Sequence, residues 1–149
     1  MPEFRPGAPG ASREFPGAYR SGHTPRHPQA GALRQAREKR TLTVVDDQTG
    51  SPTYTVDLSR AITGLLEHNS RGIFHVANQG ICTWYTFSQA ILKFAQVEGV
   101  ELTPISTEAL ARPAARPSYS VLDTQKFGQE TGMRMRHWTD ALMDYLSDA

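Results

Sequence analysis

The sequence predicts an α/β fold in which short parallel strands are covered by packed helices. A β-branched run at residues 42–45 ends in a cluster of turn-forming residues, and a helical spacing of apolar residues follows at once. A second strand-like run at residues 73–77 precedes another helical pattern. Because strand, crossover helix and strand come in this order, we expect the two runs to form a parallel pair with a right-handed connection.

The loop at residues 46–52 is the first candidate binding element. It holds Asp, Thr, Gly, Ser and Pro, each of which favours turns for its own backbone reason. In α/β proteins, ligands tend to sit where a strand ends and a helix begins, because free backbone amides point outwards there. Gln48 offers both a donor and an acceptor and is a candidate substrate-binding residue. Alternatively, the loop only connects two elements.

A helix is predicted over residues 56–67. Thr53 or Thr55 is expected to cap it, and Asp57 suits the positive end of its dipole. The apolar side chains fall on one stripe: Leu58, Ala61, Ile62, Leu65 and Leu66.

The second strand-like run leads into the longest predicted helix, residues 84–97. His75 in that run has no acidic or hydroxyl partner nearby in the sequence, so we interpret it as a packed structural residue rather than a proton carrier. Thr83 is expected to cap the helix and Gly99 to supply its left-handed stop. Trp84 follows a polar loop, and it is either a cleft-lining, substrate-binding candidate or an ordinary packing residue.

The second candidate binding element is the segment 111–120, which reads ARPAARPSYS. A short extended segment at 102–105 and one helical turn at 107–110 are expected before it. Prolines fix the backbone beside Arg112 and Arg116. A pre-ordered arginine fork suits phosphate, because less entropy is lost on binding. Alternatively, both arginines are ordinary surface residues.

The carboxyl-terminal part is expected to be core. A short helix capped by Asp123 or Thr124 buries Phe127, and Gly132 closes the following turn. The last helix has a single apolar stripe: Trp138, Ala141, Leu142, Tyr145 and Leu146.

Composition separates a tail from a single folded domain. Residues 1–31 hold six of the ten prolines and five of the twelve glycines without an apolar period, so we predict a disordered segment there and one domain over residues 32–149. The first 40 residues carry eight basic and three acidic side chains but few aromatic ones, so nucleic-acid binding is not expected. Cys82 is the only cysteine, which excludes an internal disulfide. No apolar run suits a membrane span or signal peptide, and a cytoplasmic protein is the default expectation.

Three blocks of sequence resemble one enzyme family. VVDDQTGSPTYTVDLSRAI, GIFHVANQGICTWYTFSQAIL and RPAARPSYSVLDTQKF are similar to the carboxyl-terminal half of dTDP-4-dehydrorhamnose reductase, an extended short-chain dehydrogenase/reductase. The resemblance covers residues 33–146 and implies the substrate-binding lobe of that fold, without its Rossmann half. It further implies a dTDP-sugar ligand and NADPH or NADH as cofactor. For the full-length family, it also implies that a homodimer is possible.

The resemblance places Arg116 near the sugar diphosphate, with Arg112 as the weaker match. The family's chemistry needs a glycine-rich dinucleotide turn and a Tyr-x-x-x-Lys pair. Neither motif is found, since residues 7–10 follow no strand and no tyrosine has lysine four positions later. The chain alone is therefore predicted to bind substrate without reducing it, and we assign no catalytic or cofactor-binding residue. Some family members use magnesium, but no carboxylate cluster here can be assigned to it.

Two other interpretations stay open. Reductase-like proteins of this family also serve as regulatory subunits of methionine adenosyltransferase, so the chain could be a non-catalytic binding module. It could also be an unstable fragment, because about 110 folded residues without their usual neighbour would keep a small stability margin and an exposed apolar face. The block DDQTGSPTY together with RPAARPSYS favours the reductase.

Overall fold

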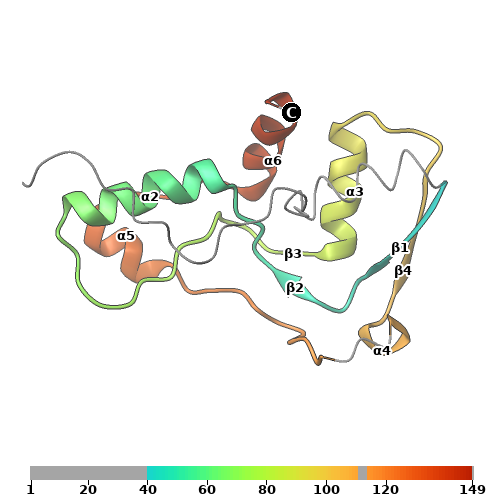
Figure 1. Cartoon of the computed structure of the whole chain (residues 1–149), viewed down its shortest axis with the longest axis horizontal. Helices are drawn as coiled ribbons and strands as arrows, with labels where there is room; N and C mark the ends of the chain where they lie inside the picture. Colours follow the sequence, from blue (N-terminus) through green and yellow to red (C-terminus); the bar gives the residue numbers. More distant parts are fainter. Residues whose placement is uncertain (1–39, 111–113, 149) are drawn as a thin grey trace, which may run out of the picture.

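The computed structural model describes residues 40–110 and 114–148, and Figure 1 shows their arrangement. The disorder predicted for residues 1–31 therefore lies outside the described residues, as does Arg112. The elements follow in chain order: β1 (Thr41–Val45), β2 (Thr49–Gly50), α2 (Thr55–Glu67), β3 (Cys82–Thr83), α3 (Trp84–Phe94), β4 (Glu101–Ile105), α4 (Thr107–Leu110), α5 (Gln125–Thr131) and α6 (Trp138–Ser147). None of the helices within these ranges has the length and apolar character needed to cross a membrane.

The parallel pair exists, but its second strand is β4 rather than the predicted strand at 73–77. β1 and β4 align from Thr41 opposite Glu101 to Val45 opposite Ile105, which confirms the extended segment expected at 102–105. Residues 73–77 form no strand, so that prediction is wrong. Phe74 and Val76 pack against side chains of α2 and α5 instead, because this part of the chain runs between two helices and has no neighbouring strand to pair with.

Three distant segments meet at β2. β2 pairs antiparallel with β3, with Thr49 opposite Thr83 and Gly50 opposite Cys82. On its other side, the Thr49 amide donates to the Ser118 carbonyl at 2.8 Å, and the Ser120 amide donates to the Thr49 carbonyl at 2.9 Å. The loop after β1 is thereby joined to the start of α3 and to the segment that follows Arg116.

Two groups of buried apolar side chains form the core. The α3/α6 cluster comprises Cys82, Phe87, Ile91, Trp138 and Leu142. The α2/α5 cluster comprises Ala61, Phe127 and Met135, with Leu65, Phe74, Val76 and Met133 packed around it. In Figure 1, α2 and α5 lie together at one end of the molecule, and α3 lies towards the end that holds β1 and β4.

Helix ends correct two predictions and confirm two, one of which is Gly132, the left-handed C-cap of α5. Tyr54, rather than Thr53 or Thr55, is the N-cap residue of α2, and it makes no side-chain cap. Thr83 does cap α3, because its Oγ1 accepts from the Thr86 amide at 3.1 Å.

The predicted stop of α3 at Gly99 is also wrong. α3 ends at Phe94, and Gln96 takes the left-handed conformation with φ of 52°. The Val97 amide then donates to the Leu92 carbonyl at 2.9 Å, which is the usual helix-closing bond. Gly99 also has positive φ, but it lies beyond the helix and turns the chain towards β4.

Candidate functional site

A hollow of about 140 Å³ opens where the loop after β1 meets the start of α3. Three segments supply its walls, and we refer to it below as the hollow: Gly50, Ser51, Pro52, Cys82, Thr83, Trp84 and Ser120. The β2–β3 pairing and the bonds between Thr49 and the segment 118–120 hold these walls together. The hollow therefore lies at the end of a strand and the start of a helix, where backbone amides are available to a ligand.

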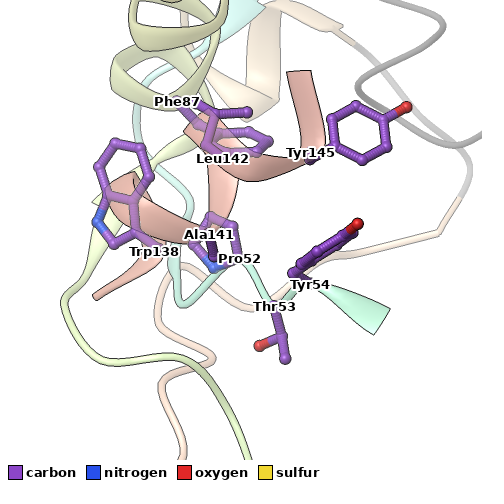
Figure 2. A pocket seen from close by; sticks show the side chains of 8 residues that line it. All are labelled: Pro52, Thr53, Tyr54, Phe87, Trp138, Ala141, Leu142 and Tyr145. Atoms are coloured by element: carbon purple, nitrogen blue, oxygen red, sulfur yellow. The ribbon is translucent and has the colours of Figure 1, made fainter. Parts of the chain in front are cut away.

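A second, much smaller crevice lies behind the same loop. Figure 2 shows Pro52 and Tyr54 facing side chains of α6, with Phe87 of α3 beside them. Its volume of about 10 Å³ is close to that of a single water molecule, so it has no room for an organic ligand. This crevice is the seam along which the loop packs on the core.

Trp84 satisfies both interpretations drawn from the sequence. It is the first residue of α3 and is 42% exposed. Its ring meets Phe87 edge to face, with centroids 6.2 Å apart, while Trp84 also lines the hollow. One part of the indole is thus held by the core, and another part is available for stacking on a flat ligand group.

Gln48 is turned away from the hollow in this structure. Its Nε2 donates to Thr107 Oγ1 at 2.9 Å, at the start of α4. Thr107 in turn donates to Asp47, from its amide at 2.8 Å and its hydroxyl at 2.6 Å. These hydrogen bonds hold the pKa of Asp47 below its ordinary value. Gln48 thus ties the loop to α4, and its role in binding stays a prediction.

Arg116 is brought near the loop by its backbone. It is exposed, it lies two residues before Ser118, and it makes no hydrogen bond or ion pair with the described residues. The segment 118–120 joins the loop at Thr49, so the two predicted binding elements are adjacent in space. The structure assigns no ligand to Arg116, whose role also stays a prediction.

A buried polar cluster behind the hollow was not anticipated from the sequence. Asp57, Asn78 and Arg136 form it, and Asp57 is 7% exposed. Arg136 Nε donates to Asp57 Oδ2 at 2.8 Å, and Asn78 Nδ2 donates to the same oxygen at 2.9 Å. Arg136 also pairs with Asp144 of α6. One signal was available, because Asp57 lies four residues before Ala61 and hence on the buried face of α2.

Electrostatics favour the ionised pair in this cluster. Burial alone would raise the pKa of Asp57, but hydrogen bonds from Arg136 and Asn78 outweigh it, and the pKa lies below its ordinary value. The Arg136 pKa is raised by its bonds to Asp57 and Asp144. The cluster is therefore charged at neutral pH, and it links α2 to α6.

Cys82 forms part of the hollow's wall and belongs to the α3/α6 cluster. It is 8% exposed, and burial raises the pKa of its thiol to about 11. At neutral pH the thiol is protonated, so it acts here as a small apolar side chain rather than a nucleophile. Ser51 and Ser120 lie in the two candidate binding elements, at residues 46–52 and 111–120, although neither was named individually as a binding residue.

The described residues show no assignable site for a dinucleotide or a metal ion. A Cβ at Gly50 would lie 3.1 Å from Ser120 Oγ, so the missing side chain lets the segment 118–120 pack closely against the loop. Within residues 40–110 and 114–148, no group of three or more His, Cys, Asp or Glu side chains is placed to hold a metal ion. We therefore derive no chemical step through either group.

Comparison with known proteins gives consistent results. A family model described as the RmlD substrate binding domain matches residues 22–149. The spore coat polysaccharide biosynthesis protein SpsK of Bacillus subtilis is 45% identical over 116 residues, which cover 78% of this chain and 40% of SpsK. The dTDP-4-dehydrorhamnose reductase of Mycobacterium tuberculosis is 36% identical over 105 residues, covering 70% of this chain and 34% of that enzyme.

A solved structure is similar to this chain in its fold as well as in sequence. The crystal structure of dTDP-4-dehydrorhamnose reductase from Bacillus anthracis in complex with NADP is similar with a TM-score of 0.78 at 32% identity. The similarity covers 81% of this chain and 43% of that one. The chain thus spans about 40% or less of the length of the curated relatives named above. Its fold is the substrate-binding domain of an extended short-chain dehydrogenase/reductase, and the chain belongs to the RmlD substrate-binding domain family.

Proposed function

We propose that this chain is the sugar-nucleotide-binding part of a dTDP-4-dehydrorhamnose reductase. In that reaction, a hydride from NADPH or NADH reduces the 4-keto group of dTDP-4-dehydrorhamnose and yields dTDP-rhamnose for polysaccharide synthesis. Membership of the RmlD family supports the assignment, and so do relatives whose names refer to that reductase and to spore coat polysaccharide biosynthesis. No observation favours a regulatory module of the methionine adenosyltransferase type.

The observation that carries the proposal is the junction of the two predicted binding elements at one hollow. The loop after β1 and the segment 118–120 are hydrogen-bonded at Thr49, and both contribute walls beside Trp84. The walls combine backbone amides, hydroxyl groups and an exposed indole edge. Such a set suits a ligand with a flat base, hydroxyl-bearing sugars and phosphate oxygens.

Arg116 is proposed to contact the diphosphate. Pro117 follows it directly, and Ser118 anchors the segment to the loop, so the backbone that carries the guanidinium is held before a ligand arrives. The guanidinium has no described partner to give up on binding. A planar donor fork held in this way matches two phosphate oxygens better than a flexible ammonium group would.

Calorimetric titration with dTDP tests this proposal directly. The parent chain should bind dTDP, and Arg116→Ala should weaken binding by about 1.5–3 kcal/mol, which is the usual contribution of a hydrogen bond to a charged group. Arg71→Ala is the matched control, because Arg71 is an exposed arginine beyond the far end of α2. Equal affinity of the Arg116→Ala variant and the parent would remove Arg116 from the site, and no dTDP binding by the parent would contradict the proposed function.

We further propose that the chain by itself does not catalyse the reduction. The residue four positions after each of the five tyrosines differs from the lysine that the chemistry requires: His23, Leu58, Gln89, Asp123 and Ala149. Mixing the chain with NADPH and dTDP-4-dehydrorhamnose should leave the NADPH absorbance constant. Oxidation of NADPH that depends on the chain would contradict this.

The other sequence-based predictions stay predictions. They include the cytoplasmic location, the absence of nucleic-acid and membrane partners, the homodimer of the full-length family, the use of magnesium and the substrate contacts of Gln48 and Arg112.

A further inference from the structure

Asn78 stands where the hollow adjoins the polar cluster. It is 2% exposed, and each polar atom of its side chain has a partner. Its Oδ1 accepts from the Tyr54 amide at 2.8 Å. Its Nδ2 donates to Asp57 Oδ2 at 2.9 Å and to the Arg136 carbonyl at 3.2 Å. A buried amide whose bonding groups are all used fixes the segments it joins, because releasing any one of them would leave an unpaired polar group.

The segment 51–54 lines the hollow at Ser51 and Pro52 and continues into Thr53 and Tyr54, which line the smaller crevice. Besides the Tyr54 bond to Asn78, the Asn78 amide donates to Thr53 Oγ1 at 3.2 Å, and Thr53 Oγ1 donates to the Ser51 carbonyl at 3.1 Å. Ser51 Oγ also donates to the Gly80 carbonyl at 2.9 Å. Two bonds thus join this wall to Asn78, one at Tyr54 and one at Thr53, and the second continues to Ser51 through Thr53.

The opposite wall is held differently. Residues 82–84 are fixed by the β2–β3 pairing and by the packing of Cys82 and Trp84 on Phe87 and its neighbours. The 51–54 wall is therefore held by polar bonds together with the packing of Pro52 and Tyr54 on α6, whereas the opposite wall is held by strand pairing and apolar packing. A change confined to the polar attachment would alter the shape of the hollow without disturbing the core.

We propose that Asn78 is a positioning residue for the bound sugar nucleotide, because it fixes the 51–54 wall of the hollow. The Asp57–Arg136 pair orients the side-chain amide of Asn78. Because Nδ2 faces the Asp57 carboxylate, Oδ1 faces the Tyr54 amide. The nature of the ligand rests on the proposed function above, whereas the placement of the wall does not.

The test compares Asn78→Ala with Thr131→Ala. Thr131 is also buried and polar, with Oγ1 donating to the Phe127 carbonyl and accepting from the Met133 amide, but it lies in α5 away from the hollow. Under conditions where both variants are folded, calorimetry should show the Kd for dTDP raised about tenfold by Asn78→Ala and changed less than about twofold by Thr131→Ala. Equal Kd changes in the two variants would overturn the proposal.

A second readout needs no ligand. The chain has two tryptophans, so Trp138→Phe leaves Trp84 in the hollow as the single fluorophore. In that background, Asn78→Ala should change the acrylamide quenching constant of Trp84, while Thr131→Ala should leave it unchanged. If the parent fails to bind dTDP but the Trp84 quenching follows this pattern, the proposed function fails and the positioning role stands. Unchanged quenching in Asn78→Ala would overturn the positioning role.

Thr53→Val provides a milder variant in case Asn78→Ala does not fold. Valine keeps the shape of threonine but removes the oxygen that receives the Asn78 amide and donates to Ser51. We expect a rise in Kd of about threefold and a shift of Trp84 quenching in the same direction as in Asn78→Ala. A folded Thr53→Val variant with the Kd and quenching of the parent would contradict the proposal.

Discussion

The α3/α6 cluster and the α2/α5 cluster bury apolar surface in different ways. In the first, large side chains from two helices meet directly, and the rings of Phe87 and Trp138 pack edge to face with centroids 5.6 Å apart. In the second, Phe127 is the only fully buried ring, and aliphatic and methionine side chains surround it together with the partly buried Phe74. A Cβ at Gly64 would lie 2.4 Å from Met133 Sδ, so the irregular chain after α5 lies directly against α2. Both regions pair two helices, but in the second the irregular chain after α5 also packs against α2.

The two clusters are also connected to the hollow in different ways. The α3/α6 cluster supplies one wall of the hollow through Cys82 and Trp84. The α2/α5 cluster reaches the hollow only through the polar cluster, in which Asp57 of α2 bonds Asn78 and Arg136. The wall with Cys82 and Trp84 is therefore part of the α3/α6 cluster, whereas the polar cluster connects the hollow to the α2/α5 cluster by hydrogen bonds.

Removing a ring from each cluster should give the largest effects. Phe87→Ala and Phe127→Ala each delete a side chain that is no more than 3% exposed, and each should lower the free energy of unfolding by about 3–5 kcal/mol. Urea denaturation followed both by circular dichroism and by tryptophan fluorescence measures this. Because both tryptophans lie in or beside the α3/α6 cluster, equal midpoints from the two probes would mean that the clusters unfold together. A Phe127→Ala midpoint that falls by circular dichroism alone would show separate units.

Trp138→Phe is the control for those truncations. It keeps a ring opposite Phe87 and removes the indole Nε1, a buried donor that has no partner among the described residues. The cost of the smaller ring is thus partly offset by the loss of an unpaired polar group, and we expect a change below about 1.5 kcal/mol. A loss as large as that of Phe87→Ala would mean that the shape of the indole, rather than aromatic burial, determines stability.

The polar cluster should be sensitive to acid. Asp57→Asn keeps the side-chain shape but removes the charge that pairs with Arg136, and should cost about 1–3 kcal/mol at pH 7. Since the folded-state pKa of Asp57 is lowered, its contribution is present above the unfolded-state value of about 3.9 and is lost as the pH falls through the folded-state pKa. The difference between parent and variant should therefore shrink below about pH 4.

Urea midpoints of both proteins at several values between pH 7 and pH 3 measure this difference. The pKa of Asp47 is also lowered, but Asp47 is present in both proteins, so its effect cancels in the subtraction. If the difference between parent and variant stays constant across this range, Asp57 does not stabilise the protein through its charge.

The two clusters also differ in how much of their structure could be predicted from the sequence. The α3/α6 cluster follows from helical spacing, since the stripe with Phe87 and Ile91 and that with Trp138 and Leu142 are the ones that pack. Residues 73–77 show the limit: Phe74 and Val76 alternate as in a strand, but they are partly buried against α2 and α5, where no strand is available to pair with. Local pattern identifies many of the buried side chains but not what buries them, and it also put Ile62 and Leu66, which are exposed, on the apolar stripe.

The site divides in the same way. The sequence pointed to the two elements that meet at Thr49 and to Trp84, because loops at helix starts and proline-held arginines have local signatures. Cys82 and Ser120 became wall residues only through pairing with β2, which is a contact between distant segments. The partnership of Asp57 with Arg136 spans 79 positions, so no local rule could reveal it.

Two glycines with positive φ should distinguish backbone strain from close packing. Gly80→Ala places a Cβ 2.1 Å from His137 Nε2, whereas Gly99→Ala has nothing within 4 Å. Both variants carry the penalty of a left-handed alanine, about 1 kcal/mol, because φ is 83° at Gly80 and 74° at Gly99. In Gly80→Ala the free energy of unfolding should fall by about 1–2 kcal/mol more, because His137, the N-cap residue of α6, must move. Equal midpoints in urea would mean that His137 is free to shift without cost.

The rate of Cys82 alkylation should give the sharpest test of where the hollow meets the core. Because burial raises the thiol pKa from 9.0 to about 11, its thiolate fraction at pH 8 falls about a hundredfold, and reaction with iodoacetamide should be slower than in urea by at least that factor. Phe87→Ala loosens the cluster that holds Cys82 and should speed the reaction, whereas Phe127→Ala, in the other cluster, should not. Mass spectrometry of timed samples measures the rate. If both variants accelerate alkylation equally, the wall at Cys82 depends on the stability of the whole domain rather than on the α3/α6 cluster.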